Sequence, residues 1–187
     1  MDEFSRMVSG ELYNPGDPAL WELRLRAADL CEELNRLSFR QEAERREVLR
    51  RLLGGVGENV FICRNFYCDY GVNIYCGSDI YINYNCVMLD CAGITLGNNV
   101  LIGPNCGLYT AIHPIEPELR RQGTETAKPI RIGDNVWLGG NVTVLPGVSI
   151  GCGSVIGAGS VVTKDIPENA VAFGNPCQVI RRINSEI

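Results

Sequence analysis

The chain has 187 residues, 45% of them hydrophobic, and a formal net charge of −5, which suits one folded unit with a sizeable core. Its 17 basic residues are interspersed with acidic ones, so no basic stripe marks a nucleic-acid-binding face. The first residues, MDEFSRM, are acidic where a secretory signal would be basic, and no run of apolar residues is long enough to cross a membrane. We expect a soluble, cytoplasmic protein with no nucleic-acid or membrane partner.

Residues 1–55 are predicted to form an N-terminal helical cap, because leucines recur there at spacings of three, four and seven between charged residues. Asp17 followed by Pro18 predicts a helix start, since aspartate accepts hydrogen bonds from free backbone N–H groups and proline suits the first helical position. Ser38 and Gln41 have the spacing of a capping box, which predicts that a second helix begins there.

From Val56 onward the sequence repeats every six residues, which predicts a parallel β-helix over residues 56–167. Three blocks carry the repeat: Ile132, Leu138, Val144, Ile150, Ile156 and Val162; then Leu96, Ile102 and Leu108 in the same register; and Val56, Ile62, Cys68, Ile74, Ile80 and Cys86, offset by one irregular step. Ordinary sandwich strands would instead alternate with a period of two.

A period of six corresponds to one flat strand plus a corner, and three such units close a triangular coil of eighteen residues. One aliphatic side chain per face points inward, and glycine or asparagine occupies the corners, as in residues 97–99 and 133–135. At a spacing of about 4.8 Å per coil, roughly five coils fit between residues 56 and 166. The expected fold is therefore an all-β core, a left-handed parallel β-helix of hexapeptide repeats with an N-terminal helical cap.

The nine cysteines do not have the pattern of a disulfide scaffold or a metal site. Their number is odd and no secretory signal is visible, so reduced thiols are expected. The cysteines from Cys63 to Cys91 lack the CxxC spacing and have no nearby histidine, which argues against zinc. Cys68, Cys86 and Cys106 fall at inward positions of the repeat, where cysteine acts as a small apolar residue.

The segment of about 113–129, HPIEPELRRQGTETAKP, has no aliphatic row and is predicted to leave the β-helix as an extruded loop; residues 168–187 are expected to form a C-terminal extension. The loop begins with His113, the only histidine, whose ordinary pKa suits a general base, although a histidine before proline can also be a plain exposed turn. Further polar residues that could bind a polyhydroxylated acceptor are Asp17, Asp69, Asn83, Asn85 and Asp90.

Seven segments together resemble the maltose and galactoside O-acetyltransferases, including the nodulation-type sugar acetyltransferases. They are GELYNPGDPAL (10–20), CDYG (68–71), NYNCVMLD (83–90), YTAIHP (109–114), NVWLGG (135–140), VIGAGSVVTKDIP (155–167) and GNPCQVIR (174–181). The resemblance covers essentially the whole chain. Hexapeptide repeats occur in many acyltransferases, but the GELYNPGDP segment combined with the HP loop is much more specific.

The resemblance implies transfer of an acetyl group from acetyl-coenzyme A to a sugar hydroxyl, in a homotrimer whose sites lie between neighbouring subunits. His113 resembles the base, Glu125 a residue that orients it, and the Gly140 N–H the donor that stabilises the oxyanion. The resemblance places Asp17, Asp69 and Asn83 at the acceptor, and Trp137, Gly140, Ala158, Thr163, Lys164 and Arg181 at the coenzyme. Ile82 and Phe173 depart from the usual pattern and are expected to reshape a pocket. No metal is required.

Three alternative functions account for the sequence less well. A carbonic anhydrase on the same fold would need three histidines for its metal, and the sequence has one. An antibiotic acetyltransferase of the streptogramin or chloramphenicol type keeps the chemistry but lacks the GELYNPGDP segment. A catalytically silent trimeric scaffold predicts damage to the site, whereas His113, Asn83, Asp17 and Gly140 are all present.

Overall fold

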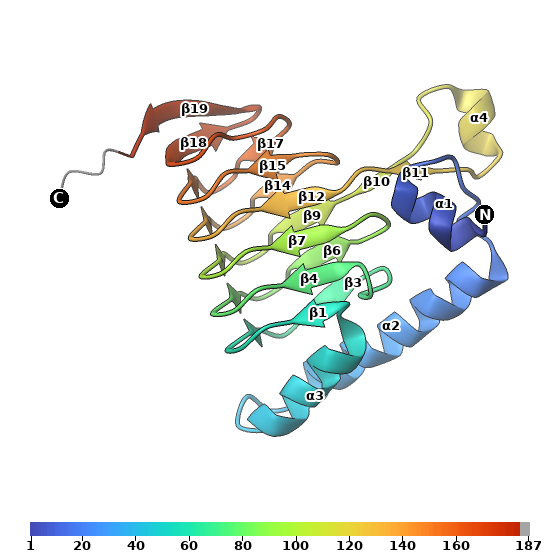
Figure 1. Ribbon diagram of the computed structural model, residues 1–187, viewed down its shortest axis with the longest axis horizontal. Coiled ribbons are helices and arrows are strands. Elements are labelled where there is room, and N and C mark those ends of the chain that lie inside the picture. Colours follow the sequence, from blue (N-terminus) through green and yellow to red (C-terminus); the bar gives the residue numbers. More distant parts are fainter. Residues whose placement is uncertain (184–187) are drawn as a thin grey trace.

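The computed structural model describes residues 1–183 and contains a parallel β-helix with helices packed against its first coil (Figure 1). Each coil contributes three short strands, and equivalent strands of successive coils pair in parallel, so the stack has three flat sheets. This arrangement confirms the predicted fold class. We name each sheet by its first strand.

The β1 sheet contains β1 (Gly55–Val56), β4 (Ile74–Cys76), β7 (Ile94–Leu96), β12 (Ile130–Ile132) and β15 (Ser149–Ile150). The β2 sheet contains β2 (Phe61–Ile62), β5 (Tyr81–Ile82), β8 (Leu101–Ile102), β13 (Trp137–Leu138), β16 (Val155–Ile156), β18 (Ala170–Gly174) and the antiparallel β19 (Cys177–Arg182). The β3 sheet contains β3 (Tyr67–Cys68), β6 (Val87–Leu89), β9 (Gly107–Tyr109), β14 (Thr143–Val144) and β17 (Val161–Val162).

The inward row predicted from Ile132 to Val162 is confirmed, since each of its six side chains is at most 2% exposed. Burial of one such aliphatic side chain contributes about 1.5–3 kcal/mol, so the row is a main source of stability. The corners also follow the prediction, because asparagine occupies left-handed backbone there, as at Asn99 and Asn135.

The register predicted for the first coils was wrong after β3. Backbone pairing places Val56 opposite Cys76 and Cys76 opposite Leu96, so these coils advance by 20 residues (76 − 56 and 96 − 76) rather than eighteen. The additional residues lie at the corners between β3 and β4 and between β6 and β7. The side chains of Ile74, Ile80 and Cys86 are buried, but the residues in register with Val56, Ile62 and Cys68 are Cys76, Ile82 and Met88.

Helices α2 (Pro18–Arg36) and α3 (Glu42–Leu52) lie against the open end of the first coil, as Figure 1 shows. The predicted start of α2 is confirmed, because the Asp17 carboxylate accepts hydrogen bonds from the backbone of the first turn. The predicted capping box is only half formed. Gln41 accepts from the Ser38 N–H at 3.0 Å, but α3 begins after Gln41 and has no side-chain cap.

Two side chains of the helical cap make the hydrogen bonds to the first coil that a preceding coil would otherwise make. The Asn35 amide bonds both backbone groups of Phe66, donating to the carbonyl at 3.0 Å and accepting from the N–H at 3.2 Å. The Arg45 guanidinium is buried and donates to the carbonyls of Leu34, Leu37 and Ile62. These bonds satisfy polar groups whose burial without partners would be destabilising.

The segment predicted to leave the β-helix contains a short helix, α4 (Pro117–Arg121), and returns through an antiparallel pair formed by β10 (Ala111–Ile112) and β11 (Thr126–Ala127). Helix α1 (Glu3–Ser9), which the sequence analysis did not predict, packs against β11. Within residues 1–183, none of the helices is long and apolar enough to span a bilayer. The last four residues of the predicted 168–187 extension lie outside the described part.

Candidate active site

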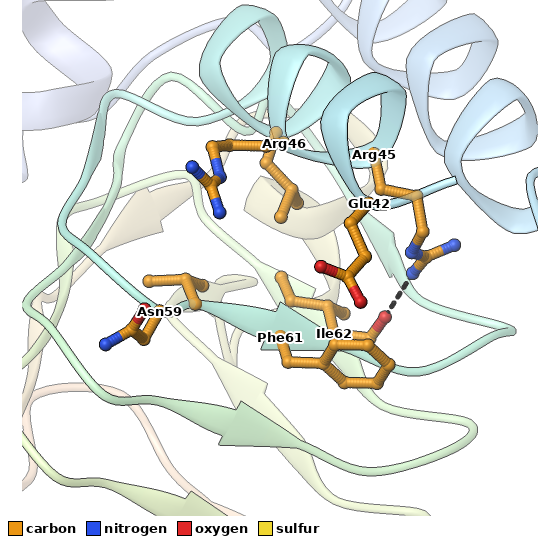
Figure 2. Close-up of a pocket in the computed structure, with 8 residues that line it drawn as sticks. Glu42, Arg45, Arg46, Asn59, Phe61 and Ile62 are labelled. Atoms are coloured by element: carbon orange, nitrogen blue, oxygen red, sulfur yellow. Dashed lines mark hydrogen bonds between the residues drawn. The ribbon is translucent and has the colours of Figure 1, made fainter. Parts of the chain in front are cut away.

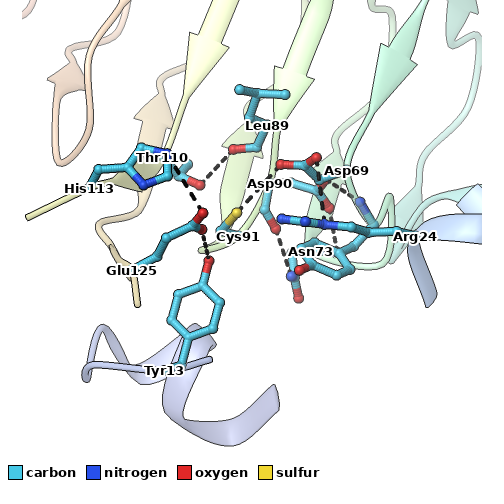
Figure 3. A network of polar contacts seen from close by, with 11 residues as sticks. Tyr13, Arg24, Asp69, Asn73, Leu89, Asp90, Cys91, Thr110, His113 and Glu125 are labelled. Carbon is cyan, nitrogen blue, oxygen red and sulfur yellow. Dashed lines mark hydrogen bonds and ion pairs between the residues drawn. The ribbon is translucent and has the colours of Figure 1, made fainter. Parts of the chain in front are cut away.

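His113 lies where the extruded loop leaves the edge between the β3 and β1 sheets, directly after β10 (Figure 3). Its side chain is 62% exposed, and its Nε2 atom is 3.7 Å from Oε1 of Glu125, a side chain only 11% exposed. The structure therefore brings together the predicted base and the predicted orienting carboxylate.

The GELYNPGDP segment, here called the cap segment, holds Glu125 in place through Tyr13. The two residues pair as an antiparallel bridge, with N–H to carbonyl distances of 3.0 and 3.1 Å. The Tyr13 hydroxyl also donates to Oε2 of Glu125 at 2.6 Å, and both side chains are buried. Burial is the main reason that the pKa of Tyr13 is raised, followed by contacts with Cys91 and Glu125. The phenol therefore stays protonated and acts as a hydrogen-bond donor.

Asp69 lies on the same edge and has two partners that suit a carboxylate. The Cys91 thiol is 3.5 Å from Oδ2, and Nε of Arg24 is 3.9 Å from Oδ1. Burial raises the pKa of Cys91 to about 12, so the thiol remains a donor. Burial also raises the pKa of Asp69, while Arg24 and the Cys91 hydrogen bond oppose this effect. The Arg24 guanidinium lies over the ring of Tyr70, 5.1 Å from its centroid.

Asp90 supports this edge from inside the molecule. It is fully buried, and its carboxylate accepts from the N–H groups of Tyr70 at 2.8 Å and Asn73 at 3.2 Å. Burial raises the pKa of Asp90 to about 6, and the negative charge of Asp69 adds to this effect, whereas the backbone N–H groups oppose it. Asp90 is thus a positioned structural carboxylate whose charge state changes in weakly acidic solution.

A second group of predicted residues lies on a different edge, where strands of the β2 sheet turn into the β3 sheet. Asn83 follows β5, Gly140 follows β13 and Ala158 follows β16. Gly140 and Ala158 thus lie on successive coils, and the coil of β8 separates Asn83 from Gly140. The Gly140 carbonyl accepts from the Gly159 N–H at 2.9 Å, whereas within residues 1–183 the Gly140 N–H donates to no protein acceptor. This N–H is therefore available to an oxyanion.

The remaining predicted coenzyme residues are exposed. Trp137 and Arg181 lie on strands of the β2 sheet, and Thr163 and Lys164 follow β17 on the edge that carries Asp69. In the described chain, Lys164 and Arg181 form no ion pair. One chain does not bring all predicted residues together, because its two edges lie on opposite sides of the β3 sheet.

Two residues occupy places that their predicted roles do not explain. The Asp17 carboxylate caps α2 by accepting from the N–H groups of Ala19 at 2.9 Å and Leu20 at 3.4 Å, so its predicted contact with the acceptor remains a prediction. The expectation that Ile82 reshapes a pocket was wrong, because its side chain faces the interior of the β-helix and is fully buried. Phe173 is exposed beside Gly157.

A cavity of about 270 Å³ lies away from this chemistry, between α3 and β2 (Figure 2). It is lined by Glu42, Arg45, Arg46, Leu49, Asn59, Val60, Phe61 and Ile62. None of these is a predicted site residue, and the Arg45 guanidinium is already bonded to backbone carbonyls. Within residues 1–183, no cluster of three or more histidine, cysteine, aspartate or glutamate side chains could hold a metal ion.

Three further residues, Tyr13, Arg24 and Cys91, complete the polar network in Figure 3 and were not predicted from the sequence. Tyr13 stands in the GELYNPGDP segment, but nothing in a single sequence indicates that this segment meets residue 125, more than one hundred positions away. Arg24 is one of several charged residues in its helix, and their spacing does not distinguish it from the others. Only the structure shows that its side chain faces Asp69.

Comparisons with known proteins show that this chain is similar to sugar O-acetyltransferases. The profile of the maltose acetyltransferase hexapeptide capping motif matches residues 6–57, and that of the hexapeptide repeat of succinyl-transferase matches residues 129–164. Galactoside O-acetyltransferase of Lactococcus lactis is 46% identical over 98% of this chain and 89% of its own length. The crystal structure of a maltose O-acetyltransferase from Clostridium difficile superposes with a TM-score of 0.97, at 45% identity and 99% coverage of both chains. A galactoside acetyltransferase in complex with coenzyme A has a TM-score of 0.94 and 43% identity, covering 98% of this chain and 92% of its own.

Proposed function

Because this chain belongs to the family of galactoside and maltose O-acetyltransferases, which are acyltransferases, we propose that it moves the acetyl group of acetyl-coenzyme A to a hydroxyl of a sugar. The observation that carries the proposal is the exposed His113 imidazole held 3.7 Å from the nearly buried Glu125 carboxylate. The solved relative that contains coenzyme A supports the choice of acetyl donor.

In the proposed reaction, His113 removes the proton of the acceptor hydroxyl while its oxygen attacks the thioester carbonyl. The C–O bond forms, and the carbonyl becomes a tetrahedral oxyanion that accepts a hydrogen bond from the Gly140 N–H. The C–S bond then breaks, and the leaving thiolate takes the proton from His113. Glu125 stabilises the imidazolium between these two steps. No metal is needed for any of them.

The remaining predicted residues bind the two substrates. Asp69 and Asn83 hold acceptor hydroxyls, since a carboxylate and an amide are the groups that bind sugars by directional hydrogen bonds. On the coenzyme side, Gly140, Ala158 and Thr163 line the pantetheine arm through their backbones. Lys164 and Arg181 meet phosphates. Trp137 flanks the coenzyme from the outer face of the β2 sheet.

The active unit in this proposal is a homotrimer, in which each site takes one edge from each of two subunits. Two features of the single chain support it. His113 and Asn83 lie on opposite sides of the β3 sheet. In addition, Tyr81, Leu101 and Trp137 are paired neighbours on the outer face of the β2 sheet and are 39%, 50% and 53% exposed, an apolar row suited to association.

Subunit complementation tests the shared site. His113→Ala removes the base from one edge, and Ala158→Trp blocks the coenzyme on the other, so each variant alone is expected to be inactive. In randomly mixed trimers, about a quarter of the sites combine an intact edge from each subunit and regain activity. Co-expression of the two variants, followed by assays at equal protein concentration, measures this. A mixture as inactive as its components, or an active monomer in light scattering, would contradict the proposal.

The activity itself is tested by thiol release from acetyl-coenzyme A with glucose, maltose, galactosides, chitin fragments and chloramphenicol as acceptors. We expect turnover with at least one sugar. Turnover with chloramphenicol alone would favour an antibiotic acetyltransferase. Binding of neither acetyl-coenzyme A nor a sugar would favour the silent scaffold.

A further inference from the structure

We propose that Tyr13 is a positioning residue of the active site, which fixes the Glu125 carboxylate so that one oxygen faces His113. This inference rests on the proposed function and assigns a role in it to the cap segment. Tyr13 does not touch the imidazole. It acts through the carboxylate between them, as Figure 3 shows for the hydroxyl, Glu125 and His113.

The geometry divides the two oxygens of Glu125 between two partners. Oε2 accepts from the Tyr13 hydroxyl at 2.6 Å, and Oε1 lies 3.7 Å from Nε2 of His113. A carboxylate with one oxygen bound to a fixed donor can no longer rotate freely about its side-chain torsions. The remaining oxygen is therefore held towards the imidazole, where its charge acts on the proton that the base takes up.

Both the side chain and the backbone of Tyr13 are fixed by their contacts. Its side chain is 1% exposed and packs in a small core with Met7, Leu20 and Ala127. Its backbone is paired with that of Glu125 in both directions. Donor and acceptor are thus joined by three hydrogen bonds, so the position of the carboxylate follows the position of the cap segment.

The extruded loop explains why such a clamp is useful. His113 and Glu125 lie at the two ends of this loop, and the intervening α4 has no buried residue. In this region only β10 and β11 pair with each other, through two residues each. The loop alone therefore provides few contacts that fix the carboxylate relative to the histidine, and Tyr13 supplies one from outside it.

Tyr13→Phe tests this role because it removes only the hydroxyl and keeps the ring in its core. We expect kcat to fall about 10- to 100-fold, the size of effect that follows from a misplaced catalytic group, with little change in the KM for acetyl-coenzyme A. In a Glu125→Gln background, the same change should cost less than about twofold, because the group through which Tyr13 acts is already altered. Tyr75→Phe removes a hydroxyl from an exposed ring on the β1 sheet and should leave kcat unchanged.

A second readout does not depend on activity. His113 is the only histidine, so the imidazole nitrogen signals in an NMR spectrum belong to this residue alone. We expect Tyr13→Phe and Glu125→Gln to displace the Nε2 signal in the same direction, and Tyr75→Phe to leave it in place. An unmoved signal in Tyr13→Phe, or equal losses of kcat with and without Glu125, would overturn the role. Absence of acetyl transfer with a displaced signal would instead overturn the proposed function and leave the positioning intact.

Discussion

We expect His113→Ala to lower turnover by a factor of about 10² to 10⁴, the usual contribution of a general base, while the affinity for acetyl-coenzyme A stays nearly unchanged. The loss is confined to chemistry, because the imidazole is mostly exposed and the substitution opens no cavity in the core. Steady-state kinetics with the best sugar acceptor measure the first effect, and titration calorimetry with coenzyme A measures the second.

Added imidazole provides the control for this substitution. The alanine variant leaves space at an exposed position beside Glu125, so free imidazole can enter and restore part of the activity. Restoration should be greater for His113→Ala than for His113→Phe, whose ring occupies the same space. Full activity of His113→Ala without imidazole would show that another group is the base.

The second large effect concerns Asp90 and the pH dependence of stability. Its pKa is raised in the folded chain from 3.8 to about 6, so between these values the native state holds a proton that the unfolded state has released. Asp90 therefore favours folding below about pH 4, and this contribution is lost as the pH rises through 6. The loss amounts to about 3 kcal/mol in total, of which about 1 kcal/mol falls between pH 5 and pH 7.

Asp90→Asn removes this titration and is therefore the variant to compare. Urea unfolding of both proteins at the same concentration, at several values from pH 5 to pH 8, gives the free energy of unfolding. The amide can accept from only one of the two N–H groups, so a constant loss of stability is expected as well. What matters is the slope: the difference between the two proteins should shrink as the pH rises, and parallel curves would contradict the raised pKa.

The fold could be predicted because its physics is periodic. From residue 132 to residue 162, every inward side chain stands six positions after the last, and the buried row follows this count. The prediction was wrong where the period breaks, at the corners after β3 and β6, since inserting two residues shifts a row without removing its apolar character. Ile80 and Cys86 look like members of the row and are buried next to it.

The candidate site was less accessible to prediction, because its parts meet through tertiary contacts. His113 is conspicuous as the only histidine, and Glu125 was named through a family resemblance rather than through spacing. The position of Asp17 before proline predicts its role as a helix cap. This local signal does not indicate whether the carboxylate also contacts a sugar. The pairing of Tyr13 with Glu125 joins a cap to a loop, and a single sequence contains no periodicity that reports it.

The side chains that complete the first coil also limit how copies of this chain can join. A stack of parallel coils ends in an open backbone edge, on which a second molecule could add its own coil and begin a fibre. At the cap end, Asn35 and Arg45 already occupy the backbone groups of Phe66 and Ile62. A side-chain amide or guanidinium offers no further strand edge, so polymerisation from this end is blocked and the lateral faces are left for assembly.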